Sequence, residues 1–142
     1  ASSFLSGMIR EPLQGEDANV PVNPDLRVVL NSPEGAVAGL RHAAAVPDGV
    51  WGGPRGVNLP GISVTVGEMA AALETVGGAD VAARLSWERD ETIERIVTSW
   101  PAEVASDRAA NARLQNRLYS IEGARQAVAA AAARGLMPLG RA

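Results

Sequence analysis

The sequence contains no cysteine, no lysine and a single histidine, His42. Without cysteine it cannot form disulfides, thiolate metal ligands or cysteine nucleophiles, which fits a cytoplasmic protein. Without lysine it cannot supply a P-loop lysine, a Schiff base or the lysine of a Tyr-x-x-x-Lys pair. One histidine within a predicted helix argues against a transition-metal site and against a Ser-His-Asp triad.

Charge and long apolar runs are also scarce. The chain has 13 basic residues, all arginine, against 16 acidic ones, a net charge of −3. This balance predicts neither a nucleic-acid partner nor an anionic membrane surface. No apolar run approaches the ~20 residues that span a bilayer. The 142 residues are 46% hydrophobic, enough to bury the core of one domain. The chain opens without methionine or a polar leader, so we expect a piece of a longer protein.

Apolar residues at helical spacing predict a first helix over residues 3–13, with Pro12 and Gly15 marking its end. Residues 16–24 are polar and contain proline, which indicates a loop. Two adjacent valines between turn residues predict a strand over residues 26–30.

A second helix is predicted directly after this strand. Ser32 can cap it, Pro33 suits its first position, and Glu34 is favourable in its first turn. It is expected to run to residue 46, with an inward face of Val37, Leu40 and Ala44.

A second strand is predicted over residues 55–59, closed by Pro60 and Gly61. The glycine-rich residues 52–56 precede this strand instead of joining a strand to a helix. They therefore indicate a plain turn and not a phosphate-binding loop.

Thr65 and Glu68 have capping-box spacing and predict a helix that ends at Gly77 and Gly78. Its expected inward residues are Val66, Met69, Ala70 and Leu73. A third strand is predicted over residues 84–88, and Asp90 can cap a helix that stops before Pro101 and carries Ile93, Ile96 and Val97. Residues 106–134 are rich in alanine and arginine and predict one or two helices. This alternation of helices and strands predicts an α/β fold.

Four segments resemble, in order, the second half of an extended short-chain dehydrogenase/reductase. They are SSFLSGMIREPLQG, LRVVLNSPEGAVAGLRHAAAVP, RGVNLPGISVTVGEMAAALETVGG and RIVTSWPAEVASDRAANARL. The last segment is similar to short-chain L-threonine dehydrogenases and, more so, to the D-erythronate dehydrogenase group. The resemblance covers residues 1–114, which it implies are the last Rossmann strands and the helical substrate lobe. It weakens over residues 115–142, a divergent helical tail.

The resemblance implies an NAD(P)-dependent oxidoreductase acting on a hydroxyl of a small sugar acid, and thus a role in carbohydrate metabolism. The family's nucleotide-binding glycine loop and Tyr/Lys pair belong to the first half. No catalytic residue is therefore assigned here, and NAD or NADP is expected to bind in the intact enzyme and not to this chain alone. The implied partners are a small hydroxy acid, the missing N-terminal Rossmann part and a second copy in a homo-oligomer such as a dimer.

Five substrate-binding candidates follow from the resemblance: Ser2, Ser3, Phe4, Ser32 and Trp100. The two opening serines match positions where the family directs hydroxyls at the substrate, and a hydroxyl both donates and accepts hydrogen bonds. Ser32 lies at a strand end, the side where open α/β sheets bind ligands. Each also has a structural explanation: a helix cap for the serines, core packing for Phe4, and packing between lobes for Trp100.

Two other functions remain open. The first is a nucleotide-sugar epimerase or dehydratase of the same superfamily, which would need a larger pocket and more arginine contacts to a diphosphate. The second is a non-catalytic interaction module derived from such a fold. Because a fragment would expose strand edges and apolar faces, we expect self-association or a partner chain.

Overall fold

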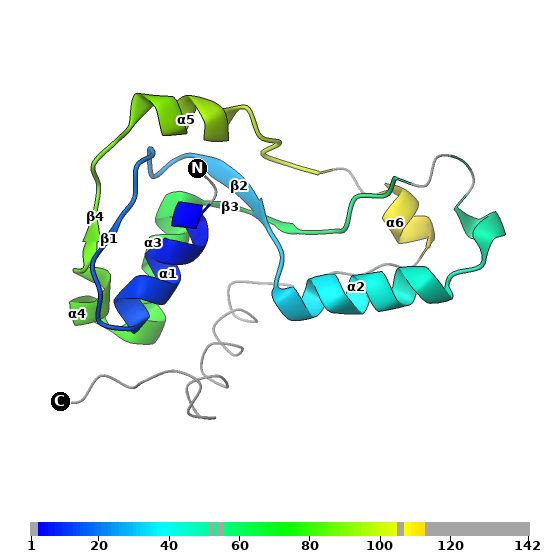
Figure 1. The fold of residues 1–142 in the computed structure, drawn as a ribbon, viewed down its shortest axis with the longest axis horizontal. Coiled ribbons are helices and arrows are strands. Elements are labelled where there is room, and N and C mark those ends of the chain that lie inside the picture. Colours follow the sequence, from blue (N-terminus) through cyan, green and yellow to red (C-terminus); the bar gives the residue numbers. More distant parts are fainter. Residues whose placement is uncertain (1–2, 52, 54–55, 105–106, 113–142) are drawn as a thin grey trace.

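The computed structural model describes residues 3–51, 53, 56–104 and 107–112. Figure 1 shows a body of packed helices and strands, and beside it an arm that carries one long helix. Most elements alternate between helix and strand along the chain, as the sequence predicts. No helix within the described residues has both the length and the apolarity needed to cross a bilayer.

Helix α1 (Ser3–Leu13) has the predicted bounds. Met8, on its apolar face, is fully buried in the main core. The chain leaves the helix through Gly15, whose φ of 86° is a conformation that residues with a Cβ adopt only with strain. The end predicted from Pro12 and Gly15 is confirmed.

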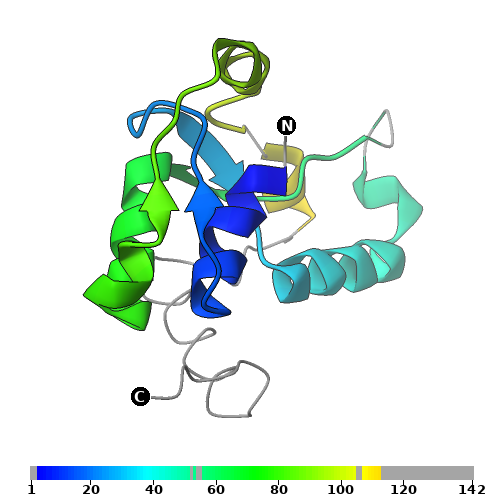
Figure 2. The ribbon, with the colours of Figure 1, turned by 60° about the vertical axis from the view of Figure 1, so that its left-hand side comes forward.

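Strands β1 (Ala18–Asn19) and β4 (Leu85–Ser86) form a short parallel pair, seen as adjacent arrows in Figure 2. The prediction that residues 16–24 form only a loop is therefore wrong. Val20 and Val22, which follow β1, are fully buried. A two-residue strand shows no alternation, and its hydrogen bonds come from residues far away in the sequence, so the local pattern does not reveal it.

Strands β2 (Arg27–Leu30) and β3 (Ile62–Thr65) pair antiparallel, with Val28 opposite Val64. The first is the predicted strand, but the strand predicted over residues 55–59 is wrong, since residues 56–59 have no regular structure. Val57 and Leu59 alternate in the same way as Ile62 and Val64. Residues 62–65 form the strand instead of residues 55–59, because their pairing with β2 buries Val28 and Val64 together in the core.

Helix α3 (Val66–Gly77) begins with the predicted capping box. Glu68 N donates to Thr65 Oγ1 at 3.0 Å, and Thr65 N donates to Glu68 Oε2 at 2.7 Å. Val66, Met69 and Leu73 are buried as expected, and Ala70 packs partly buried against the core. Gly78, with a φ of 87°, ends the helix and leads into the short α4 (Ala79–Ala82), which the sequence pattern did not predict.

Helix α2 (Pro33–Ala45) follows β2 and forms the long helix of the arm. Its start is confirmed, because Gly35 N donates to Ser32 Oγ at 2.8 Å. Its predicted inward face is wrong: Val37 is 56% exposed, Leu40 is 72% exposed, and Ala44 is exposed. The buried residues of the helix are Gly35 and Gly39.

The far part of the arm contains a 3-10 turn, η1 (Asp48–Val50), and the short helix α6 (Asp107–Asn111). Ala109 and Ala112 are buried there in a second, smaller cluster with Ala43, Val46, Trp51 and Val57. Arg108 ties α6 to the segment between α2 and β3 by donating to the carbonyl oxygens of Gly56 at 2.9 Å and Trp51 at 2.6 Å. The helix predicted from residue 106 is thus present in part, and residues from 113 onward lie outside the described part of the chain.

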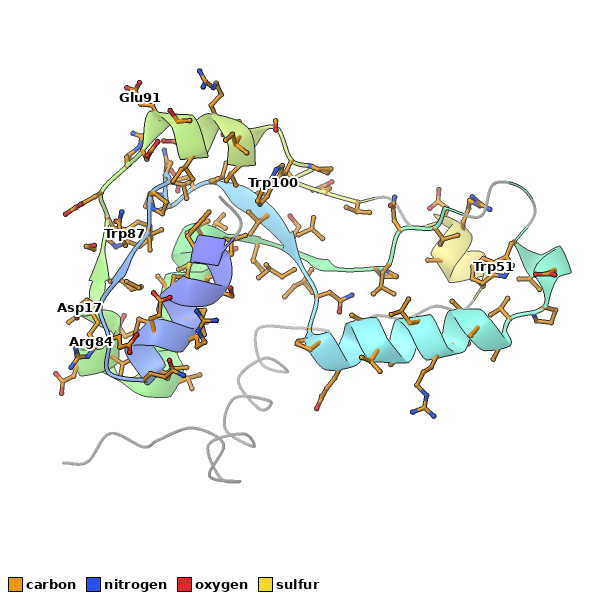
Figure 3. All side chains as sticks on the ribbon, viewed as in Figure 1. Asp17, Trp51, Arg84, Trp87, Glu91 and Trp100 are labelled. Atoms are coloured by element: carbon orange, nitrogen blue, oxygen red, sulfur yellow. The ribbon has the colours of Figure 1, made fainter. Side chains whose placement is uncertain are left out.

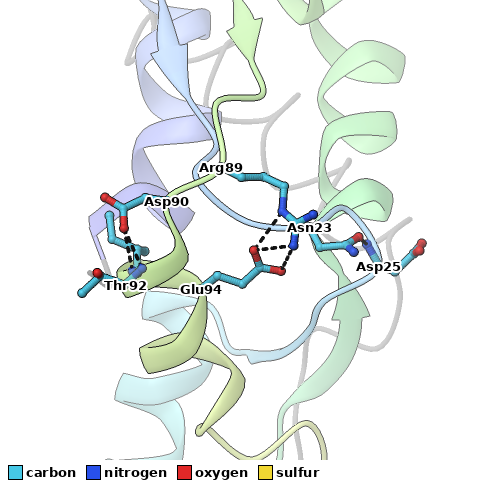
Figure 4. Close-up of polar contacts among 7 residues, drawn as sticks. Asn23, Asp25, Arg89, Asp90, Thr92 and Glu94 are labelled. Atoms are coloured by element: carbon cyan, nitrogen blue, oxygen red, sulfur yellow. Dashed lines mark hydrogen bonds and ion pairs between the residues drawn. The ribbon is translucent and has the colours of Figure 1, made fainter.

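Helix α5 (Glu91–Thr98) crosses the top of the body in Figure 1. Asp90 caps it as predicted, accepting from the backbone N–H groups of Thr92 and Ile93 (Figure 4). Arg89 makes a two-pronged ion pair with Glu94, with both N–O distances at 2.9 Å. Val97 is the buried anchor of this helix, whereas Ile96 is 43% exposed, so the expected apolar face is only partly covered.

Candidate functional site

The carboxyl end of β2 holds the first candidate, Ser32. Its hydroxyl oxygen accepts the Gly35 N–H and therefore serves as the cap of α2. The hydroxyl hydrogen remains available for donation, so capping does not exclude contact with a substrate. The neighbouring Asn31 donates from Nδ2 to the Pro60 carbonyl at 2.9 Å, which ties the end of β2 to the segment that enters β3.

Asn31 also carries an acceptor that the sequence pattern did not single out. Its Oδ1 is buried without a hydrogen-bond partner. A Cβ at Gly35 would clash with this oxygen, so the oxygen lies directly against the first turn of α2. The Asn31 side chain therefore ties the end of β2 to Pro60 through Nδ2, while its Oδ1 lies beside the first turn of α2.

Phe4 and Trp100 lie on the body. Both are partly buried and pack against the main core cluster. Figure 3 shows Trp100 at the end of α5, beside the β2–β3 ribbon. The segment that follows it is tied to this ribbon, because Ser63 Oγ donates to the Ala102 carbonyl at 2.6 Å. Two of the five candidates are thus held on one cluster by side chains of several elements.

The two remaining candidates lie at the start of the chain. Ser3 is the first residue of α1, and Ser2 lies outside the described residues. The position of Ser3 follows from the helix, whose register is held by the fully buried Met8.

A groove of about 450 Å³ lies on the arm, away from these candidates. Its lining is mostly apolar and includes Leu40, Ala43, Trp51 and Leu59, with Asp48 as the charged member. Figure 3 places Trp51 at the far end of the arm from Trp100. The sequence pattern did not single out Trp51 as a candidate. Such a lining can hold apolar atoms but has no second polar group for proton transfer.

Three acidic side chains of the body have structural partners. Asp90 caps α5, Glu68 completes the capping box of α3, and Asp17 pairs with Arg84 at 3.2 Å. Figure 3 shows the last pair beside β1 and β4. In the described part of the chain, no three or more His, Cys, Asp or Glu side chains gather closely enough to hold a metal ion.

The described strand–helix junctions do not fit a dinucleotide. The chain passes from β2 to α2 through Asn31 and Ser32, and from β3 directly into α3. Neither junction has the glycine-rich loop that lets a pyrophosphate approach the backbone. What these residues can supply is a set of hydroxyl and aromatic groups on a rigid frame.

Comparison with known proteins gives related sequences. The chain is 49% identical over 109 residues to the D-erythronate dehydrogenase of Cupriavidus necator, covering 77% of this chain and 34% of that protein. It is 43% identical over 109 residues to the D-erythronate dehydrogenase of Haemophilus influenzae, covering 77% of this chain and 35% of that protein. The chain therefore spans about a third of the length of the curated relatives it matches. No profile of a known protein family matches it.

Solved structures share the fold. The nucleoside-diphosphate-sugar epimerase from Agrobacterium tumefaciens superposes with a TM-score of 0.80 at 34% identity, over 88% of this chain and 36% of that one. L-threonine 3-dehydrogenase from Trypanosoma brucei has a TM-score of 0.70 at 16% identity, over 89% of this chain and 38% of that one, which supports the fold alone. The predicted α/β fold, part of a Rossmann-type enzyme, is confirmed. Together with the two dehydrogenases, these similarities show that the chain resembles part of an extended short-chain dehydrogenase/reductase.

Proposed function

We propose that the chain is the C-terminal, substrate-side part of an NAD(P)-dependent oxidoreductase that acts on a hydroxyl of a small sugar acid resembling D-erythronate. The observation that supports this most is the 49% identity to a D-erythronate dehydrogenase over 109 residues. The sequence contains no lysine, and the described junctions do not fit a dinucleotide. Cofactor binding and proton transfer are therefore assigned to polypeptide outside this chain.

The contribution of this chain is to bind and orient the substrate. Ser2, Ser3 and Ser32 offer hydroxyls that can donate to a carboxylate and accept from a substrate hydroxyl. Phe4 and Trp100 offer apolar walls held by the main core. Side chains on a rigid frame position a small substrate with little loss of freedom on binding, which favours reaction at one hydroxyl.

The test is a full-length chimera in which residues 1–114 replace the matching stretch of the Cupriavidus necator relative. Oxidation of D-erythronate is followed by the formation of reduced nicotinamide, with NAD and with NADP. We expect activity with one of them, and Ser3→Ala should raise KM several-fold through the loss of one hydrogen bond. Ser6→Ala on the same helix is the control. Failure of a soluble, folded chimera to oxidise D-erythronate would contradict the proposal.

A nucleotide-sugar epimerase is the second candidate, supported by the 34% identity to the Agrobacterium tumefaciens structure. The same chimera distinguishes the two. Turnover of a nucleoside-diphosphate sugar without turnover of D-erythronate would favour the epimerase. If neither substrate is turned over and the 142-residue chain forms a folded oligomer by light scattering, the non-catalytic interaction module is favoured instead.

A further inference from the structure

Strand β4 has one paired edge and one open edge. In the described part of the chain its sheet consists of β1 and β4 alone, and Figure 1 shows β4 on the side of β1 that lies away from the arm. The ladder with β1 uses the carbonyl oxygens of Arg84 and Ser86, which accept from Ala18 N at 3.0 Å and Val20 N at 2.8 Å. The residues that alternate with these two therefore direct their backbone groups to the open edge.

The open edge extends beyond the two residues of β4. Asn19 Oδ1 accepts from Glu88 N at 2.9 Å, and Asn19 Nδ2 donates to the Glu88 carbonyl oxygen at 3.2 Å. This side chain holds residues 84–88 along β1. Leu85 and Trp87 direct their N–H and C=O groups to the open edge, where no other strand of the described chain pairs with them. Unpaired backbone groups in a row are a template on which another strand can add.

The two faces of this edge differ in polarity. Successive side chains of a strand point to opposite faces, so Leu85 and Trp87 share one face, and Arg84, Ser86 and Glu88 share the other. Leu85 packs against the main core, whereas Trp87 is 40% exposed. Figure 3 shows Trp87 beside the β1–β4 pair. The apolar face of the strand therefore reaches the open edge, where no described element covers the tryptophan.

We propose that a second copy of this chain pairs with the open edge of β4, antiparallel and about a two-fold axis that passes between the two Ser86 residues. Identical edges meet in this way in most homodimers. The register places Leu85 of each copy opposite Trp87 of the other, and both of these pairs exchange backbone N–H···O=C bonds. Each exposed tryptophan gains an aliphatic side chain beside it, which is a stabilising cross-strand pair.

Charge on the polar face favours the same register. Antiparallel pairing about Ser86 sets Arg84 of each copy opposite Glu88 of the other, so an ion pair forms on each side of the axis. Asp17, which is 85% exposed and pairs with Arg84 at 3.2 Å, extends this row of alternating charge. A shift of one residue would set Arg84 opposite Arg89, and like charges directly opposite each other destabilise a sheet.

The occupant follows from the order of the residues along the edge. Residues 84–88 are basic, apolar, small, apolar and acidic in turn. Read in the reverse direction, this order is complementary to itself, which a second copy explains and an unrelated strand does not. The edge is small, because stable dimers bury roughly 800 Å² per partner. We therefore expect a weak, concentration-dependent association.

The first test is a disulfide across the two-fold axis. The chain has no cysteine, so Ser86→Cys introduces a unique thiol. The two substituted residues would form a non-hydrogen-bonded pair with Cα atoms about 4.5 Å apart, which lies within the range that a disulfide spans. Thr98→Cys, at an exposed position of α5, is the control for random collision.

Both variants are oxidised mildly, in the 142-residue chain and in the full-length chimera, and covalent dimers are quantified on non-reducing gels. We expect Ser86→Cys to cross-link at least about tenfold faster than Thr98→Cys in both proteins, because pairing holds the two thiols together. Equal rates of the two variants would overturn the proposal. Cross-linking of Ser86→Cys in the 142-residue chain alone would show that the rest of the longer polypeptide covers the edge, and would also overturn it.

The second test checks the register by exchanging charges. Arg84→Glu and Glu88→Arg are each added to the Ser86→Cys chain. Either variant alone sets like charges opposite each other, so its cross-linking should fall several-fold. In an equal mixture of the two, every facing pair has opposite charges again, and cross-linking between the two variants should recover. If the mixture cross-links no faster than the separate variants, the proposed register is wrong. Neither test measures activity, so both are independent of the proposed substrate.

Discussion

Replacing Gly61 by alanine should destabilise the protein where the chain enters β3. A Cβ at this position would lie 2.5 Å from Val29 Cγ1 and 2.8 Å from the Leu30 carbonyl oxygen. Real Cβ atoms do not approach other heavy atoms so closely. The valine methyl can rotate away, but the oxygen belongs to the backbone of β2 and cannot move without shifting the strand. The added methyl group therefore forces β2 and the incoming segment apart.

The cost can be estimated from overpacked cores, where an extra methyl group typically costs about 1–3 kcal/mol. Domains of this size are stable by about 5–15 kcal/mol, so the loss is a sizeable fraction. At about 4 °C per kcal/mol, the melting temperature should fall by roughly 4–12 °C.

Gly56→Ala is the matched control for this substitution. A Cβ there would meet nothing within 4 Å, and its φ is not left-handed. Alanine should leave stability unchanged or raise it by about 0.4–1 kcal/mol, because it restricts the unfolded chain. Thermal unfolding followed by far-UV circular dichroism measures both variants. If Gly61→Ala melts within 1 °C of Gly56→Ala, the close approach between Gly61 and the end of β2 is wrong.

Three further substitutions test the cap of α3, the core and the surface. Thr65→Ala should cost about 1 kcal/mol of unfolding free energy in urea denaturation, because the Glu68 N–H loses its acceptor, whereas Thr65→Ser should cost little; equal losses would contradict the cap. Met8→Ala should cost about 2–5 kcal/mol by the same measurement, since it leaves a cavity at a fully buried site, and Met8→Leu should cost less than about 1.5 kcal/mol. Arg89→Ala should change stability by less than about 1 kcal/mol, because the Arg89 side chain is 60% exposed to solvent, although that of Glu94 is only 18% exposed. A loss from Arg89→Ala that does not shrink in 1 M salt would refute this surface assignment.

The candidate site was predictable from the sequence only in part. Ser32 follows a strand and precedes a proline, and this local arrangement identified it as the N-cap of α2. The structure contains the expected hydrogen bond from Gly35 N to Ser32 Oγ. Whether any of the five candidate side chains touches a substrate stays a prediction. The Trp51 groove forms where residues 51–59 lie alongside α2, and α6 packs against the same region from a distant part of the sequence. No local pattern carries that information.

The sequence by itself determined where helices α2, α3 and α5 begin. Capping at Ser32, Thr65 and Asp90 is decided by side chains within three residues of the bonds they make, so short sequence patterns suffice. Periodicity likewise located α1 and α3, because their burial repeats with the helical turn.

Only the tertiary structure decided which strands form and which faces are covered. β1 forms because β4 supplies its hydrogen bonds. β3 forms at residues 62–65, and not at residues 55–59, because residues 62–65 are the ones that pair with β2. Val37, Leu40 and Ala44 of α2 are an inward face by sequence pattern, yet they lie exposed in the structure. Periodicity shows that a helix has a face to bury, but the surface that buries it must come from elsewhere in the fold.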